Sequence, residues 1–195
     1  ARIISNTYRK FAVLLLVSMI PTALLGYTAR RLVVLAADSV LIPSAGLLVT
    51  GIVLLVIDLA RTGGTKAAKD ANLSDAMWIG LCQGISVFPG LSRSGLTISA
   101  GLMSGFSRTF AVKYSYILSI PAIIGSLIME LGQFGSPAMT VGLGFAYVLG
   151  MIVSGVTAFF VIRYCLKLVH KGRFRVFAIY CFVIGLVTLI INHML

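Results

Sequence analysis

The sequence predicts an all-α polytopic membrane protein, because it is apolar, carries few charges and arranges its apolar residues in long runs. Of its 195 residues, 59% are hydrophobic and only 11% are charged. Soluble domains carry about 25% charged residues, so a bilayer suits this composition better than water. The net charge of +11 does not indicate nucleic acid, since basic and aromatic residues are not interleaved. Basic residues that flank apolar segments are typical of membrane proteins, and membrane lipids are their expected partners.

Five apolar segments are long enough to cross a bilayer as helices, since one crossing needs about 20 residues. They cover residues 11–29, 41–60, 114–131, 140–162 and 176–192. We expect a polar loop over residues 62–75, a short turn over residues 132–138, and a basic linker over residues 163–175.

The stretch from residue 76 to residue 106 does not fit this pattern. Pro89 and Gly90 divide it into two apolar halves, because proline lacks an N–H donor and glycine is conformationally loose. Apolar pieces of about 10–14 residues are more often re-entrant than spanning. We therefore predict a re-entrant helical hairpin that enters and leaves the bilayer at the same face.

The distribution of basic residues favours this hairpin. With it, roughly 13 basic residues lie on one side of the membrane and 2 on the other, which obeys the positive-inside rule. If the stretch crossed the bilayer once, the count would be roughly 9 against 6. The hairpin topology puts the chain's first residues and the hairpin mouth on the cytoplasmic side, and the C-terminus outside.

Arg93 then lies at the hairpin tip, where a charge is costly and marks a candidate functional site. Its planar fork of donors suits phosphate oxygens, and Ser92 and Ser94 add hydroxyl groups beside it. Gly95 allows close approach of the backbone, and Thr97 lies about one helical turn further on. The second half-helix begins here, so its free N–H groups and positive dipole end point at the same place. The structural alternative is an arginine that only pairs with a carboxylate.

Residues 83–97, QGISVFPGLSRSGLT, carry a resemblance to a known family. They match the long pattern P-G-x-S-R-S-G-x-T of the undecaprenyl-diphosphatase family, the bacitracin-resistance proteins, and the order of spans is similar over essentially the whole chain. In that family two inverted repeats each contribute one re-entrant hairpin followed by three spans. The resemblance implies catalytic roles for Arg93, Ser92 and Ser94, and substrate binding by four further residues, Gly90, Gly95, Thr97 and Gln83.

The resemblance implies an enzyme, a hydrolase that converts undecaprenyl diphosphate to undecaprenyl phosphate and phosphate. This activity recycles the lipid carrier for peptidoglycan and confers bacitracin resistance. It also implies a multi-pass protein of the bacterial inner membrane with a polyprenyl diphosphate substrate, and a homodimer is compatible with it.

The sequence departs from the family in one large respect. The family's first hairpin, E-G-x-x-E-F-x-P-x-S-S-x-G-H, is not found here. The segment PSAG at residues 43–46 is a faint likeness inside a span, and we interpret it as chance. We expect the sequence to be N-terminally truncated, with the general base and nucleophile in the absent hairpin and this fragment alone inactive. No metal site is evident in the chain, although the family resemblance suggests Mg²⁺ or Ca²⁺ as the cofactor.

The predicted organisation has four parts. Residues 1–61 hold the last two spans of the first repeat, residues 62–75 a polar cytoplasmic loop, residues 76–107 the hairpin with its phosphate-binding motif, and residues 108–195 three further spans. Two other functions stay open at this point. One is a transporter or lipid flippase with an anion site at the hairpin tip, because half-helices that meet in mid-membrane are typical of transporters. The other is a phosphatidic-acid-type phosphatase, which is disfavoured because no suitable histidine closely follows Arg93.

Overall fold

The computed structural model describes residues 2–130 and 141–194, and the named secondary-structure elements in this part of the chain are all helices. The predicted turn at residues 132–138 lies outside this part. Eight helices are found in it: α1 (Arg2–Thr28), α2 (Arg30–Ala37), α3 (Leu41–Leu59), α4 (Leu73–Ile85), α5 (Arg93–Met103), α6 (Arg108–Glu130), α7 (Val141–His170) and α8 (Phe174–Met194).

Five of these helices are long and apolar enough to cross a membrane, which confirms the predicted polytopic membrane protein. They are α1, α3, α6, α7 and α8. Their apolar side chains remain largely exposed, as lipid-facing surface requires. Pro21 and Pro121 lie within α1 and α6 without ending either helix.

Several details differ from the sequence prediction. Helix α2 was not expected, and α1 and α6 begin at Arg2 and Arg108 rather than at residues 11 and 114. The expected basic linker at residues 163–175 is mostly helical, because α7 continues through His170. No helix-breaking residue precedes Gly172, whose left-handed φ of 68° ends the helix. The polar loop also ends earlier than predicted, at Asn72, because Asn72 and Asp75 form a capping box that starts α4.

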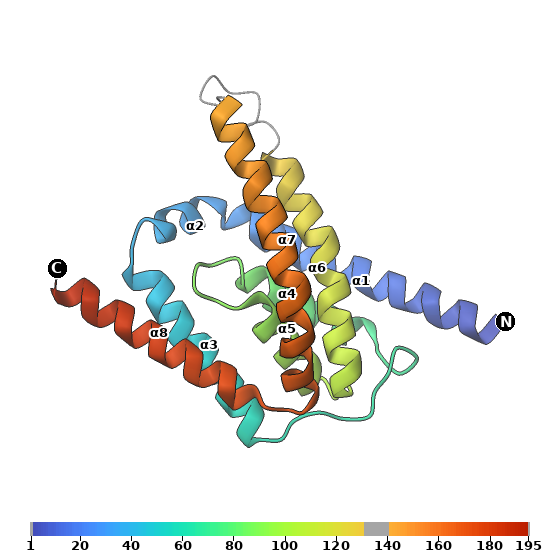
Figure 1. Cartoon of the computed structure of the whole chain (residues 1–195). Helices are drawn as coiled ribbons and strands as arrows, with labels where there is room; N and C mark the ends of the chain where they lie inside the picture. The colour runs from blue at the N-terminus through green and yellow to red at the C-terminus, as the bar shows by residue number, and fades with distance from the viewer. Residues whose placement is uncertain (1, 131–140, 195) are drawn as a thin grey trace.

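The short helices α4 and α5 lie at the centre of the molecule (Figure 1). Helix α1 packs along α4, helix α3 packs along α8, and α5 contacts both α3 and α6. Helices α6 and α7 run side by side and project away from this centre, while α1 and α8 extend toward opposite sides. The hairpin is therefore surrounded by spans that are far apart in the sequence.

Both ends of the α4–α5 hairpin meet at one loop residue, Lys66. Its backbone N–H donates to the Gly105 carbonyl at 3.1 Å, and its carbonyl accepts from the Ser107 N–H at 3.0 Å. Its ammonium group lies 3.3 Å from the Asp75 carboxylate at the start of α4. Entry to and exit from the hairpin thus lie at the same end of the molecule. At 1.5 Å per residue the two helices are only about 20 Å and 17 Å long, shorter than the ~30 Å apolar core of a bilayer.

Hydrogen bonds from α1 hold α4 in place inside this apolar surrounding. The Ser18 hydroxyl donates to the Ala76 carbonyl at 2.7 Å, and the Thr22 hydroxyl donates to the Gly80 carbonyl at 2.9 Å. Gly80 permits this approach, because a side chain there would collide with the Ser18 carbonyl. Small residues and hydroxyl groups of this kind are the usual means of close helix packing in membranes.

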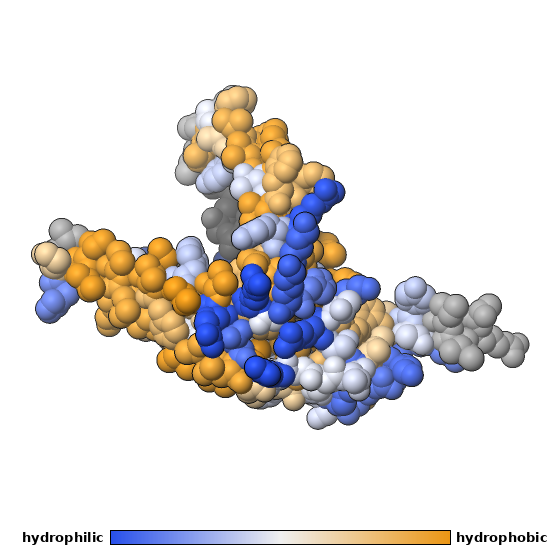
Figure 2. Space-filling model, turned by 60° about the horizontal axis from the view of Figure 1, so that its bottom comes forward, coloured by the Kyte–Doolittle hydropathy of each residue, from blue (hydrophilic) through white to orange (hydrophobic). Residues whose placement is uncertain are grey.

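Several segments rich in basic residues gather at the hairpin mouth. Lys10 donates to the Lys69 carbonyl, and the Arg108 guanidinium packs against Gly172 at the turn between α7 and α8. This end of the molecule lies at the bottom of Figure 1 and comes forward in Figure 2, which shows a concentrated hydrophilic area flanked by apolar helices. The arrangement agrees with the charge pattern that the positive-inside rule predicts.

Candidate functional site

The turn between α4 and α5 is fixed by a hydroxyl group from α3. Thr50, of which only 1% is exposed, accepts from the Ser92 N–H at 3.0 Å and donates to the Gly90 carbonyl at 3.3 Å. One side chain therefore satisfies a donor and an acceptor of a turn that is 40 residues away in sequence. Sequence reasoning missed Thr50, since a threonine within an apolar span has no motif to mark it.

Close backbone contact with α3 also determines where the turn lies. Gly90 has a left-handed φ of 84°, and a side chain there would collide with the Pro43 carbonyl. A side-chain carbon at Gly46 would lie 2.5 Å from the Pro89 carbonyl oxygen. The segment at residues 43–46, interpreted from sequence as a chance likeness, is thus the surface against which the turn packs. The small residues of this segment, inside a predicted span, were the sequence signal for a close contact with another part of the backbone.

Ser92 begins α5 as its N-cap. Its hydroxyl oxygen accepts from the Gly95 N–H at 3.1 Å, which uses one of the free donors expected at the helix start. In the described part of the chain the Arg93 and Ser94 N–H groups have no backbone acceptor. The Ser94 side chain is exposed and has no hydrogen-bond partner there either. The turn therefore offers two N–H groups and two hydroxyl groups to an anion at a positive helix end.

The Arg93 side chain is half-buried, and its guanidinium group has no ion-pair or hydrogen-bond partner among the described residues. None of the aspartates at positions 38, 58, 70 and 75 pairs with it. The structural alternative of an internal salt bridge therefore finds no support among these residues. From Thr50, beside the turn, to the end of α3 at Leu59 the helix rises about 14 Å, which corresponds to half of an apolar bilayer core.

The other two predicted site residues lie within the helices of the hairpin and not in its turn. Thr97 is 1% exposed, and its hydroxyl donates to the Arg93 carbonyl at 2.8 Å and shares a 2.5 Å hydrogen bond with Ser115 on α6. Gln83 is 2% exposed, and neither amide atom has a partner among the described residues. A buried polar group without a partner costs about 1–3 kcal/mol, and a polar ligand beside Gln83 would remove this cost. Their substrate-binding roles stay predictions.

The residues present do not by themselves fit a divalent metal ion. Within the described ranges no three His, Cys, Asp or Glu side chains lie close enough together to form a ligand set. The Mg²⁺ or Ca²⁺ expected from the family resemblance stays a prediction.

Thr50→Val is expected to lower the free energy of unfolding by about 1–3 kcal/mol, because the Ser92 N–H and Gly90 carbonyl lose their shared partner while the shape of the side chain is kept. Chemical denaturation in mixed micelles measures this change. Thr50→Ser retains the hydroxyl group and is expected to lie closer to the native value. A valine variant as stable as the native protein would show that the bridge does not hold the turn.

Fold and turn together define a polytopic membrane protein with a candidate phosphate site at the tip of a helical hairpin. The chain belongs to the bacitracin resistance protein BacA family, whose sequence profile matches residues 1–187. This confirms the resemblance that the motif around Arg93 indicates.

Curated relatives agree with this assignment. An undecaprenyl-diphosphatase from Desulforapulum autotrophicum is 40% identical over 185 residues, which cover 93% of this chain and 64% of that protein. Proteins of the same name from Alkaliphilus metalliredigens and Korarchaeum cryptofilum are 35% and 37% identical, covering 97% and 95% of this chain and 68% of each relative. The chain thus spans about two thirds of the length of the curated relatives it matches.

Proposed function

We propose that the native protein hydrolyses undecaprenyl diphosphate to undecaprenyl phosphate and inorganic phosphate. The observation that carries this proposal is Arg93 at the N-terminus of a short helix, without a partner among residues 2–130 and 141–194 and about half-way along α3. A lipid diphosphate brings a dianionic or trianionic group to a bilayer, and this turn supplies the complementary donors. The relatives named undecaprenyl-diphosphatase supply the substrate class.

In the proposed reaction, a nucleophile attacks the terminal phosphorus and the bond from that phosphorus to the bridging oxygen breaks. Overall, water supplies the fourth oxygen of the released phosphate and gives up its proton to the general base. Inorganic phosphate leaves, and the bridging oxygen stays with undecaprenyl phosphate as an added negative charge. The Arg93 guanidinium binds two phosphate oxygens as a fork and stabilises this charge, since phosphoryl transfer depends mainly on positioning and electrostatics. The N–H groups of Arg93 and Ser94 bind the same group at the helix end.

Ser92 and Gln83 take supporting roles in this proposal. The Ser92 hydroxyl already accepts from Gly95, so its own hydrogen remains available to a phosphate oxygen. The buried Gln83 amide gains the polar partner that it otherwise lacks. The family resemblance assigns the general base, the nucleophile and any metal ligands to a first hairpin whose pattern this sequence does not contain, and that assignment is part of the proposal.

We also propose the orientation in the membrane. The basic end of the molecule lies at the cytoplasmic face of a bacterial inner membrane, which puts the hairpin mouth inside and the C-terminus outside. The short lengths of α4 and α5 and their joint closure by Lys66 support a re-entrant hairpin rather than a crossing. The homodimer compatible with the resemblance stays a prediction.

Reconstitution of the native protein into sealed vesicles separates hydrolysis from the transporter alternative. We expect inorganic phosphate to be released from added undecaprenyl diphosphate. The rate of release is expected to be similar in detergent, where no membrane separates two compartments. Movement of labelled lipid diphosphate between leaflets without release of phosphate would contradict the proposal and favour a flippase.

A further inference from the structure

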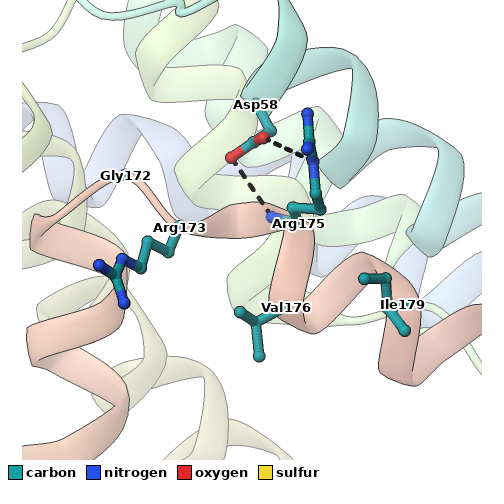
Figure 3. Close-up of a pocket in the computed structure, with 6 residues that line it drawn as sticks. All are labelled: Asp58, Gly172, Arg173, Arg175, Val176 and Ile179. Carbon is teal, nitrogen blue, oxygen red and sulfur yellow. Dashed lines mark hydrogen bonds and ion pairs between the residues drawn. The ribbon is translucent and has the colours of Figure 1, made fainter.

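A second charged site lies at the other end of α3, where α7 turns into α8. A shallow pocket of about 450 Å³ opens there (Figure 3), lined by Asp58, Gly172, Arg173, Arg175, Val176 and Ile179. It is separate from the Arg93 turn, because Asp58 lies about 12 Å along α3 from Thr50. The motif that indicated the proposed reaction includes none of the residues that line it.

The turn that forms this pocket is rigidly held. The Asp58 carboxylate accepts from the N–H groups of Phe174 and Arg175 at 3.1 and 3.3 Å, and so caps α8. Its second oxygen lies 3.5 Å from Nε of the Arg175 guanidinium. Asp58 is only 15% exposed at its side chain, so it stabilises the turn from within. The Asp58 carboxylate already occupies the N–H groups at the start of α8. An anion in this pocket is therefore bound by arginine side chains.

Positive charge exceeds negative charge around the pocket. Arg173 points away from Asp58 in Figure 3, and its guanidinium group has no partner among the described residues. Arg175 uses only Nε toward Asp58, so its two terminal nitrogens remain available. The Arg108 guanidinium packs against Gly172 from the side of α6. Two arginines therefore line the pocket together with one carboxylate, and a third arginine packs against its turn at Gly172, which favours a phosphate group as ligand.

The pocket also has an apolar wall at the depth where a span begins. Val176 and Ile179 are one turn apart on α8 and are 50% and 55% exposed. Helix α8 is a candidate span from Phe174 onward, so the arginines lie at the boundary of the membrane and these two residues lie below it. Arginines at the depth of the lipid headgroups with apolar side chains below them suit an amphiphilic ligand. Free phosphate would contact the arginines but not the apolar wall.

We propose that this pocket binds the headgroup of an anionic membrane phospholipid, with Arg173 and Arg175 on its phosphate and Val176 and Ile179 against the first part of an acyl chain. The bound lipid joins the ends of α3, α7 and α8 at the membrane surface. Its role is independent of the proposed hydrolysis at Arg93.

The test measures binding of phosphatidylglycerol to the native protein by native mass spectrometry. Arg173→Gln is expected to lower occupancy about tenfold, because it removes a charge-assisted contact with the lipid phosphate. Lys167→Gln makes the same change of charge on α7 outside the pocket. Its side chain is exposed and does not line the pocket, so salt screens its charge and occupancy is expected to stay within about twofold. Phosphatidylcholine is expected to bind more weakly than phosphatidylglycerol to the native protein.

Three results would overturn the proposal. An equal loss in the Arg173→Gln and Lys167→Gln variants would show diffuse attraction to the whole basic surface. Unchanged occupancy in Arg173→Gln, or equal binding of phosphatidylcholine, would show that the pocket does not recognise a headgroup charge. Displacement of the lipid by an equal concentration of inorganic phosphate would identify a site for free phosphate instead.

Discussion

Replacing Arg93 with alanine is expected to lower phosphate release from undecaprenyl diphosphate by at least about 100-fold, because one preorganised donor to a developing charge contributes that much in other enzymes. The guanidinium group has no structural partner among the described residues, so the variant is expected to fold normally. The measurement is initial-rate phosphate release by the purified native protein in detergent, compared with the same protein carrying the substitution.

Two further variants make this result interpretable. Arg93→Lys keeps the charge but loses the planar fork, so it is also expected to be strongly impaired. Arg31→Ala removes an exposed arginine far from the turn in sequence and is expected to keep nearly full activity. Near-normal turnover of a correctly folded Arg93→Ala protein is incompatible with the proposed site.

Gly90→Ala is expected to have the largest effect on stability, a loss of about 3 kcal/mol in the free energy of unfolding. Part of the loss comes from the left-handed φ of 84°, which a residue with a side chain rarely adopts. The rest comes from collision of the new methyl group with the Pro43 carbonyl, which forces α3 and the turn apart. Denaturation in mixed micelles measures the change, and phosphate release is expected to fall with it because Arg93 moves with the turn.

The matched control is Gly125→Ala on α6. A side-chain carbon there meets no atom within 4 Å, and its backbone is helical, so the same chemical change is expected to be neutral or slightly stabilising. If Gly90→Ala and Gly125→Ala have the same free energy of unfolding, the contact between Gly90 and Pro43 does not hold the turn.

The features set by local sequence were predictable. Runs of apolar residues predict the five spans because bilayer thickness fixes their length, and Pro89 and Gly90 predict the break because both disfavour a continuous helix. The motif at residues 83–97 identifies the family. The start of α5 at Arg93 follows from Ser92, a preferred N-cap residue.

The features set by packing between distant segments were not predictable. Thr50 resembles any hydroxyl residue in a span until the fold brings it to Gly90 and Ser92. Asp58 likewise gains its role only because α3 and α8 lie side by side. The extension of α7 to His170 was missed because its basic residues resemble a loop, although nothing before Gly172 breaks the helix.

The most direct test of the central claim is a structure of the native protein with a methylene-diphosphonate analogue of undecaprenyl diphosphate, in which the bond to be broken is inert. The terminal phosphonate is expected to lie at the start of α5, within hydrogen-bonding distance of the Arg93 guanidinium and the Ser94 N–H. An analogue bound with its phosphonates away from this turn, and with Arg93 still unpaired, would contradict the central claim.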